Sequence, residues 1–162
     1  MVSIIKRQRL HSQGGFTLIE ILVVIGIIAI LAAIVIVAIN PARQFAQARN
    51  TQRESNLNTI LNAVGQDLAD NKGIFTCAGI GTAIAAGANH IGTGAGLVNL
   101  TCLVPTYIPS AIPMDPGGTG TAGTAADTQY TISVDALGRY TVAAPNSSET
   151  ALGAPPAISV TR

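Results

Sequence analysis

An unbroken apolar run dominates the first part of the chain. Nineteen consecutive residues, Ile21 to Ile39, are apolar or glycine, and Phe16–Ile19 extend the run beyond a single acid, Glu20. A helix that rises ~1.5 Å per residue needs ~20 such residues to cross a hydrocarbon layer of ~30 Å. The pattern therefore predicts a membrane-spanning helix. The alternative is the apolar core of a discarded secretory signal, but such cores have only ~7–15 residues.

The spacing of apolar residues changes after residue 40. Seven apolar residues recur at intervals typical of one face of an amphipathic helix. They are Phe45, Ala48, Leu57, Ile60, Leu61, Val64 and Leu68. Most charged and polar side chains, among them Arg43, Arg49, Arg53, Asn56, Gln66, Asp67 and Asp70, are predicted to lie off that face. We expect one continuous helix from about Thr17 to Asp70 with a kink at Asn40-Pro41; the alternative is two helices separated at Asn40.

The strongest β signal lies between residues 130 and 144. Apolar and polar residues alternate over Tyr130–Val134 and again over Tyr140–Ala144, with a five-residue turn between the two runs. This pattern predicts an antiparallel hairpin whose apolar face packs on the helix. A third strand is expected near Leu97–Val104, and Gly- and Thr-rich stretches predict loops. The predicted fold class is α+β: a long N-terminal helix packed on a small antiparallel sheet.

Charge changes this picture little. Only 10% of the residues are charged, and the net charge is +1. Three bases precede Gly15, while six bases and all eight acids follow it. No basic patch argues for nucleic-acid binding, although Arg43, Arg49 and Arg53 recur at helical spacing and leave weak DNA contact open.

Two cysteines lie in the polar part of the chain. The spacing of Cys77 and Cys102 fits no zinc or redox motif. If this part is exported, we expect a disulfide, which would stabilise the fold by roughly 3–4 kcal/mol on the chain-entropy model. Two buried thiols that never pair are the alternative.

The start of the apolar run carries a family resemblance. A short basic leader ends in Gly14-Gly15, and Phe16-Thr17-Leu18-Ile19-Glu20 and a hydrophobic helix follow. This arrangement resembles the type III signal of type IV pilins and type II secretion pseudopilins. The resemblance implies that a prepilin peptidase cuts between Gly15 and Phe16. It also implies that Phe16 becomes N-methylated and that Glu20 docks a new subunit onto a filament.

Elementary electrostatics also predicts a role for Glu20. A lone acid at membrane depth is costly and marks a functional site. Cleavage before Phe16 would create an α-amino cation, and in a staggered stack of helices the cation of one subunit can meet the acid of the next. The alternative is local: Thr17-x-x-Glu20 is a capping box that satisfies the start of the helix. The two roles are compatible.

The resemblance implies an organisation for the whole chain. The expected parts are a leader (1–15), a transmembrane and polymerisation helix (16–40), an amphipathic half-helix (41–73) and a small β-containing domain with Gly/Thr-rich loops (74–162). The expected function is a structural subunit of a type IV pilus-like filament that serves adhesion, motility or DNA uptake. A major-pseudopilin-like subunit of a type II secretion system is the alternative.

Location and partners follow from the same resemblance. We expect a single pass through the inner membrane with the C-terminal domain outside, and then a cell-surface or periplasmic filament. The expected partners are copies of the chain, other pilins, a prepilin peptidase/methyltransferase, the lipid bilayer and an inner-membrane assembly platform with its ATPase.

Enzymatic chemistry is not expected. His90 is the one histidine after the leader, and no nucleophile elbow or metal pair accompanies it. A membrane-anchored enzyme or binding protein is the alternative class. The segment 107–116 is similar to one before the sheet of major pseudopilins, but their acid-rich calcium loop is missing. Asp115, Asp127 and Asp135 are too scattered for an ion that takes six or more oxygens. We therefore expect no cofactor, and calcium is unsupported.

Overall fold

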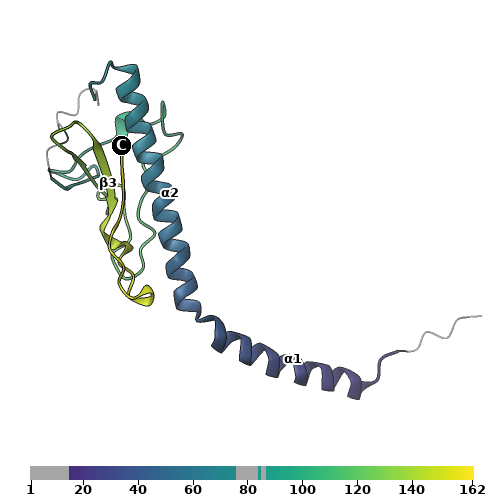
Figure 1. The fold of residues 1–162 in the computed structure, drawn as a ribbon. Coiled ribbons are helices and arrows are strands. Elements are labelled where there is room, and N and C mark those ends of the chain that lie inside the picture. Colours follow the sequence, from purple (N-terminus) through teal and green to yellow (C-terminus); the bar gives the residue numbers. More distant parts are fainter. Residues whose placement is uncertain (1–14, 76–83, 85–86) are drawn as a thin grey trace, which may run out of the picture. The chain divides into compact units, whose positions relative to one another are not determined.

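The computed structural model describes residues 15–75, 84 and 87–162. The chain forms two compact units, Met1–Asn40 and Pro41–Arg162 (Figure 1). The first unit contains helix α1 (Leu18–Ile39). The second contains helix α2 (Pro41–Asp70), strands β1 (Asn89–His90), β2 (Thr131–Val134), β3 (Tyr140–Ala144) and β4 (Ile158–Thr161), and the 3-10 helices η1 (Thr101–Leu103), η2 (Pro145–Ser147) and η3 (Thr150–Leu152). The predicted α+β class is confirmed.

Helix α1 is apolar on every side. It is 22 residues long, and its 18-residue window of candidate span has a mean hydropathy of 3.5, so the helix is long and apolar enough to cross a membrane. None of its residues is buried in the chain. Its side chains therefore lack a packing partner within the described part of the chain.

The two helices are separated at Asn40, so the prediction of one continuous helix is wrong. Asn40 has a left-handed backbone, with φ 46° and ψ 83°. The ring of Pro41 disfavours right-handed helical geometry at the residue before it, and asparagine tolerates the left-handed region better than most residues. Pro41 itself suits the first position of a new helix, where no backbone N–H is needed.

The sheet has the strand order β1-β2-β3-β4, and each neighbouring pair is antiparallel. The predicted hairpin is confirmed as β2 and β3, with Ile132 opposite Val142 and Val134 opposite Tyr140. The Asp135 carboxylate accepts hydrogen bonds from the backbone N–H groups of Leu137 and Arg139, which closes the turn. Strands β1 and β4, which flank the hairpin, were not predicted.

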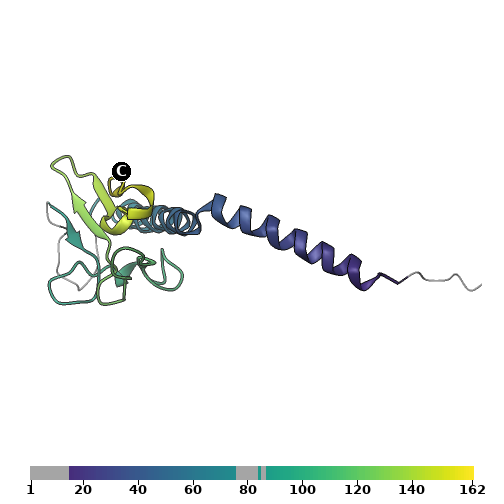
Figure 2. The same cartoon turned by 90° about the horizontal axis from the view of Figure 1, so that it is seen from below.

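The core of the second unit lies between α2 and the sheet. Figure 2 looks along α2 and shows the strands gathered on one side of it. Leu57, Ile60 and Val64 from α2 are fully buried against Ile132 and Val142 of the hairpin, so the hairpin packs on the helix as predicted.

The predicted composition of the helix face is wrong in part. Phe45 and Ala48 are exposed, whereas Ala46 between them is fully buried. By contrast, Arg53, Asn56 and Asp67 are buried. The buried face of α2 is therefore partly polar.

The predicted third strand near Leu97–Val104 is also wrong. Val98 forms only an isolated parallel bridge with Ile91, and residues 101–103 form η1. The Asn99 Oδ1 atom accepts hydrogen bonds from the backbone N–H and the hydroxyl of Thr101, at 3.0 and 2.8 Å. Such a local bond offers the backbone a turn in place of a strand ladder.

Candidate functional site

The predicted cleavage site lies just before α1 and is accessible. Gly15 is exposed, and a Cβ atom added there would meet nothing within 4 Å. The Phe16 side chain is 82% exposed. Gly14 and the rest of the leader lie outside the described residues. Nothing in the described chain covers the Gly15–Phe16 bond, and cleavage there stays a prediction.

Glu20 forms the predicted capping box with Thr17. The Thr17 Oγ1 atom accepts a hydrogen bond from the Glu20 backbone N–H at 3.2 Å. In return, the Glu20 Oε2 atom accepts from the Thr17 N–H at 3.2 Å and from its hydroxyl at 3.1 Å. Both returning bonds end on Oε2, so Oε1 accepts neither of them. The local role of Glu20 is thus present, and its role between subunits stays a prediction.

A buried ion pair joins α2 to the loop before β2. The side chains of Arg53 and Asp115 are both 0% exposed. The guanidinium binds the carboxylate with two bonds, Nε to Oδ2 at 2.8 Å and Nη2 to Oδ1 at 3.0 Å. Nη2 also donates to the Gly117 carbonyl at 2.6 Å. The paired, charge-assisted geometry fixes the position of this loop against the helix.

A second acid binds the same arginine from the C-terminal segment. The Glu149 Oε1 atom accepts from Arg53 Nη1 at 2.8 Å and from Arg49 Nε at 2.8 Å. Its Oε2 atom accepts from Arg49 Nη2 at 2.9 Å. We call Arg49, Arg53, Asp115 and Glu149 the ion cluster. It ties one turn of α2 to two segments that lie far away in the sequence.

The bonds of the ion cluster shift its pKa values. The Arg49 guanidinium, with help from Arg53, holds the pKa of the Glu149 carboxyl at about 2, although burial opposes the shift. The bond to Glu149 raises the pKa of Arg49. Burial alone would lower the pKa of Arg53, but its bonds to Asp115 and Glu149 outweigh that effect and raise it. Arg49, Arg53 and Glu149 are therefore charged at neutral pH.

The surroundings of the ion cluster leave no donor or acceptor unused. Asn50 Oδ1 accepts from Arg53 Nη1 at 2.7 Å. In the described part of the chain, every buried side-chain nitrogen and oxygen has a hydrogen-bond partner. Gly118 fits directly over the cluster: a Cβ atom there would lie 2.5 Å from both Arg49 Nε and Glu149 Oε1. The site is filled by its own side chains, with Arg49 partly exposed, as expected of a structural clamp.

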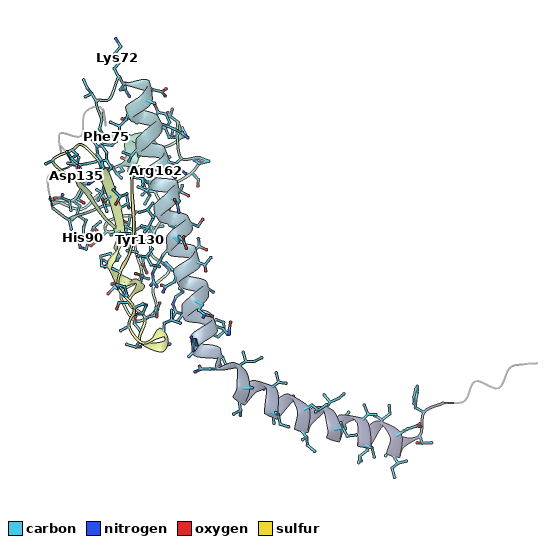
Figure 3. The ribbon with its side chains drawn as sticks, in the orientation of Figure 1. Lys72, Phe75, His90, Tyr130, Asp135 and Arg162 are labelled. Carbon is cyan, nitrogen blue, oxygen red and sulfur yellow. The ribbon has the colours of Figure 1, made fainter. Side chains whose placement is uncertain are left out.

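The other residues singled out from the sequence form no further site among those that the structure describes. Cys77 lies outside the described residues, so its pairing with Cys102 of η1 stays a prediction. His90 Nδ1 lies 3.2 Å from the Asp127 carboxylate at the surface, and Figure 3 places His90 away from α2. Among the described residues, no three His, Cys, Asp or Glu side chains come together as a metal site. The expectation of no cofactor stays a prediction.

The second unit also contains a mainly apolar cavity of about 260 Å³. Its walls include Ile91, Leu100, Val104, Ile112 and Met114, with hydroxyls of Thr93 and Ser110 at the lining. No charged side chain lines it. Its chemistry suits an apolar group and provides no nucleophile paired with a base.

Comparison with known proteins identifies the N-terminal segment. Residues 10–36 match the family model for the prokaryotic N-terminal methylation motif. The chain therefore carries the signal of type IV pilins and pseudopilins. A search of curated proteins gave no match. A search of solved structures gave none either.

The motif supports a protein of type IV pilin or pseudopilin type and suggests a structural subunit rather than an enzyme. It implies processing by a prepilin peptidase and assembly into filaments with other pilins. The apolar helix α1 fits a membrane-anchored protein.

The sequence did not reveal the ion cluster. Helical spacing put Arg53 among residues expected at the surface, and its partners are 62 and 96 positions away. The one usable signal was that Arg49, Asn50, Arg53 and Asn56 follow helical spacing as a polar stripe of their own.

Proposed function

We propose that this protein is a structural subunit of a type IV pilus-like filament, made as a prepilin and assembled through α1. The methylation motif at residues 10–36 coincides with a helix that buries none of its apolar side chains within the chain. That coincidence carries the proposal. A helix that is apolar all round requires lipid or other apolar helices around it. The membrane would surround α1 with lipid before assembly, and other copies of the chain would surround it with apolar helices in the filament.

Assembly would begin with removal of the leader. A prepilin peptidase cuts between Gly15 and Phe16, and the new N-terminus of Phe16 is methylated. The resulting α-amino cation of one subunit then meets the Glu20 carboxylate of its neighbour. The capping bonds that end on Oε2 support this step, because they orient the carboxylate without engaging Oε1. In an apolar surrounding, such a pair is strong and fixes register.

The subunit would wait in the inner membrane as a single-pass protein with its second unit outside. An assembly platform and its ATPase would move it into a cell-surface or periplasmic filament. Adhesion, motility or DNA uptake would be the role of a surface pilus. The second unit, held together by its own core and the ion cluster, would form the outer surface of the filament.

A secretion pseudopilus is the second candidate. The segment 107–116, which resembles the corresponding segment of major pseudopilins, favours it. A shear preparation of cell-surface filaments analysed by mass spectrometry separates the two. The mature chain as the dominant protein supports the pilus, whereas its presence only in membranes supports the pseudopilus.

Three matched variants test the docking role of Glu20. Glu20→Ala removes the acid and the two bonds that end on it, whereas Thr17→Ala removes the two bonds of the Thr17 hydroxyl and leaves the acid. Glu54→Ala removes an exposed acid from α2 as a control. Leader removal is followed by immunoblot, and filaments are followed by shearing and electron microscopy.

We expect all three variants to be processed and inserted into the membrane. Filaments should fail only in Glu20→Ala. Normal filaments in that variant would refute the docking role, and equal failure of Thr17→Ala would assign the defect to capping.

Gly15→Ala tests the cleavage site. The leader should remain attached, although the added methyl group meets no atom within 4 Å in this chain. A loss of processing would therefore report on recognition by the peptidase rather than on folding. Efficient cleavage of Gly15→Ala would show that the site is assigned wrongly.

A further inference from the structure

One peptide bond next to the ion cluster is chemically weaker than its neighbours. Asp115 is followed by Pro116, which makes the one Asp–Pro pair in the sequence. An aspartate carboxylate can attack the carbonyl carbon of its own peptide bond. The nitrogen of a prolyl peptide bond is readily protonated and leaves more easily than that of another residue. Asp–Pro bonds of unfolded chains are therefore cut in acid.

Solvent can reach this bond in the folded chain. The Asp115 side chain is buried, but Pro116 is exposed at the surface of the loop before β2. Exclusion of water and acid therefore does not protect the bond. Any protection must come from the way in which the Asp115 carboxylate is held.

Hydrogen bonds hold both oxygens of the Asp115 carboxylate. Oδ2 accepts from Arg53 Nε at 2.8 Å, and Oδ1 accepts from Arg53 Nη2 at 3.0 Å. Oδ1 also accepts from the Gly117 backbone N–H at 2.7 Å. An attack on the peptide carbonyl would have to break the bonds to Arg53 and leave a buried guanidinium without this partner. Separating a buried ion pair is strongly unfavourable.

The peptide carbonyl of Asp115 is itself prepared for attack. Its oxygen accepts a hydrogen bond from the Gly123 N–H at 2.9 Å. A backbone donor at this oxygen stabilises the negative charge that develops when the carbonyl is attacked. The Asp115 N–H donates to the Thr128 carbonyl at 3.0 Å, which fixes the residue in the loop. The position of the carboxylate therefore decides whether the bond is cut.

Ionisable groups from α2 and from two other segments surround the Asp115 carboxylate. Arg53 and Arg49 act on it from α2, and Glu149, from the segment before η3, binds both arginines. Tyr130 approaches from the segment before β2, but its hydroxyl bonds Asn56 and the Met114 carbonyl. Arg53 binds the carboxylate directly, so the restraint depends on this arginine.

We propose that the Asp115–Pro116 bond is a latent acid-cleavage site, which the ion cluster keeps intact by holding the Asp115 carboxylate. When the carboxylate is released, one of its oxygens bonds to the carbonyl carbon, and the Pro116 nitrogen takes a proton from solvent. The carbon–nitrogen bond breaks, its electron pair stays on nitrogen, and a cyclic anhydride forms. Water then opens the anhydride, so one fragment ends at Asp115 and the other begins at Pro116. The inference concerns the single chain and does not depend on filament formation.

Incubation of the full chain in acid, in micelles, tests the protection. A pH of about 3 lies above the Glu149 pKa of about 2, so the bonds of Glu149 to the arginines persist. Intact-mass analysis follows cleavage, in parallel with the same chain unfolded in guanidinium chloride at the same pH. A misplaced reacting group slows a reaction by about 10²-fold, so the folded chain should be cut about 10²-fold more slowly. Equal rates would overturn the proposal, and so would unfolding of the chain at this pH in circular dichroism.

Two variants separate the restraint on Asp115 from general stability. Arg53→Lys keeps a cation but loses the two parallel bonds to the carboxylate. Val142→Ala changes a fully buried core residue outside the ion cluster. Cleavage rates are compared at urea concentrations that give both variants the same free energy of unfolding.

Arg53→Lys should be cut about tenfold or more faster than Val142→Ala, because only the lysine variant releases the carboxylate within the folded chain. Equal rates in the two variants would show that general stability protects the bond, and would overturn the role of the ion cluster. Cleavage of Arg53→Lys as slow as that of the parent would overturn it as well. If Arg53→Lys does not fold, the comparison of the folded and unfolded parent decides.

Discussion

The two helices of this protein differ in whether their apolar side chains are buried against the rest of the described chain. Helix α1 is apolar apart from Glu20, and none of its side chains is buried among the described residues. Helix α2 is polar overall, yet it buries leucines, isoleucine and valine together with Arg53 against its own domain. The difference shows that α1 requires partners from outside the chain, whereas α2 is satisfied within it. Changes in α2 should therefore affect the stability of one molecule, and changes in α1 should affect assembly.

The largest effect on stability is expected from Arg53→Met. The variant leaves the carboxylates of Asp115 and Glu149 without one of their cations in a buried site. Breaking a buried pair in this way costs about 3–5 kcal/mol. Urea unfolding of the full chain in micelles, followed by the near-ultraviolet circular dichroism of its tyrosines, measures the loss.

Arg139→Met is the control for Arg53→Met. It breaks the exposed pair with Asp135 and should cost far less than Arg53→Met, because exposed ion pairs contribute little to stability. If both variants lost the same free energy of unfolding, burial of the ion cluster would not be the reason for its contribution to stability.

The next effect is expected from Glu149→Gln. This variant keeps the shape of the side chain but weakens its charged bonds, at a cost of about 1.5–3 kcal/mol at neutral pH. The pKa of Glu149 is lowered from 4.5 to about 2 by its bonds to the arginines, so its contribution is present above pH 4.5 and disappears as the pH falls towards 2. Unfolding curves at several pH values should show the parent and Glu149→Gln converging in that interval. A constant gap between them would contradict the assignment.

Gly118→Ala should have a smaller effect. Its φ of +127° is unfavourable for alanine, and its methyl group would press on Arg49 and Glu149. Gly96→Ala has a positive φ of +79° but open space around the new methyl group. Backbone strain alone costs roughly 1–2 kcal/mol. The melting temperature should fall further for Gly118→Ala than for Gly96→Ala. The reverse order would show that the ion cluster can accommodate an additional methyl group.

The smallest effect is expected from Thr17→Ala, and it should remain within α1. Loss of the cap costs about 1 kcal/mol. Hydrogen exchange of the Glu20 amide in micelles should therefore become about fivefold faster. The urea midpoint of the second unit should not move. A shift of that midpoint would show that the two helices are not energetically separate.

The sequence predicted the features that depend on local patterns. The apolar run, the Thr17–Glu20 cap and the β2–β3 hairpin follow from periodicity and turn chemistry over a few residues. The break at Asn40 was weighed as the alternative to a kink, and the preference of asparagine for left-handed geometry before proline decides it. The strand expected near Leu97–Val104 failed because the side chain of Asn99 competes with strand pairing.

The ion cluster could not be predicted for a different reason. Arg53 is charged, and periodicity alone places a charged residue of an amphipathic helix at the surface. Its burial depends on Asp115 and Glu149, which tertiary folding brings from distant segments. Only the folded structure shows that the Arg53 guanidinium forms hydrogen bonds with the carboxylates of Asp115 and Glu149. By contrast, the sequence alone predicted that α1 is an apolar, membrane-spanning helix. That prediction depends only on the unbroken apolar run and not on a partner elsewhere in the chain.

The central claim is that this chain becomes a filament subunit by losing its leader and assembling through α1. Intact-mass and N-terminal peptide analysis of protein sheared from the cell surface tests it most directly. The account predicts that the dominant species begins at Phe16 and carries one methyl group on its terminal nitrogen. Protein that still bears residues 1–15, or that is found only as single copies in the bilayer, would contradict the account.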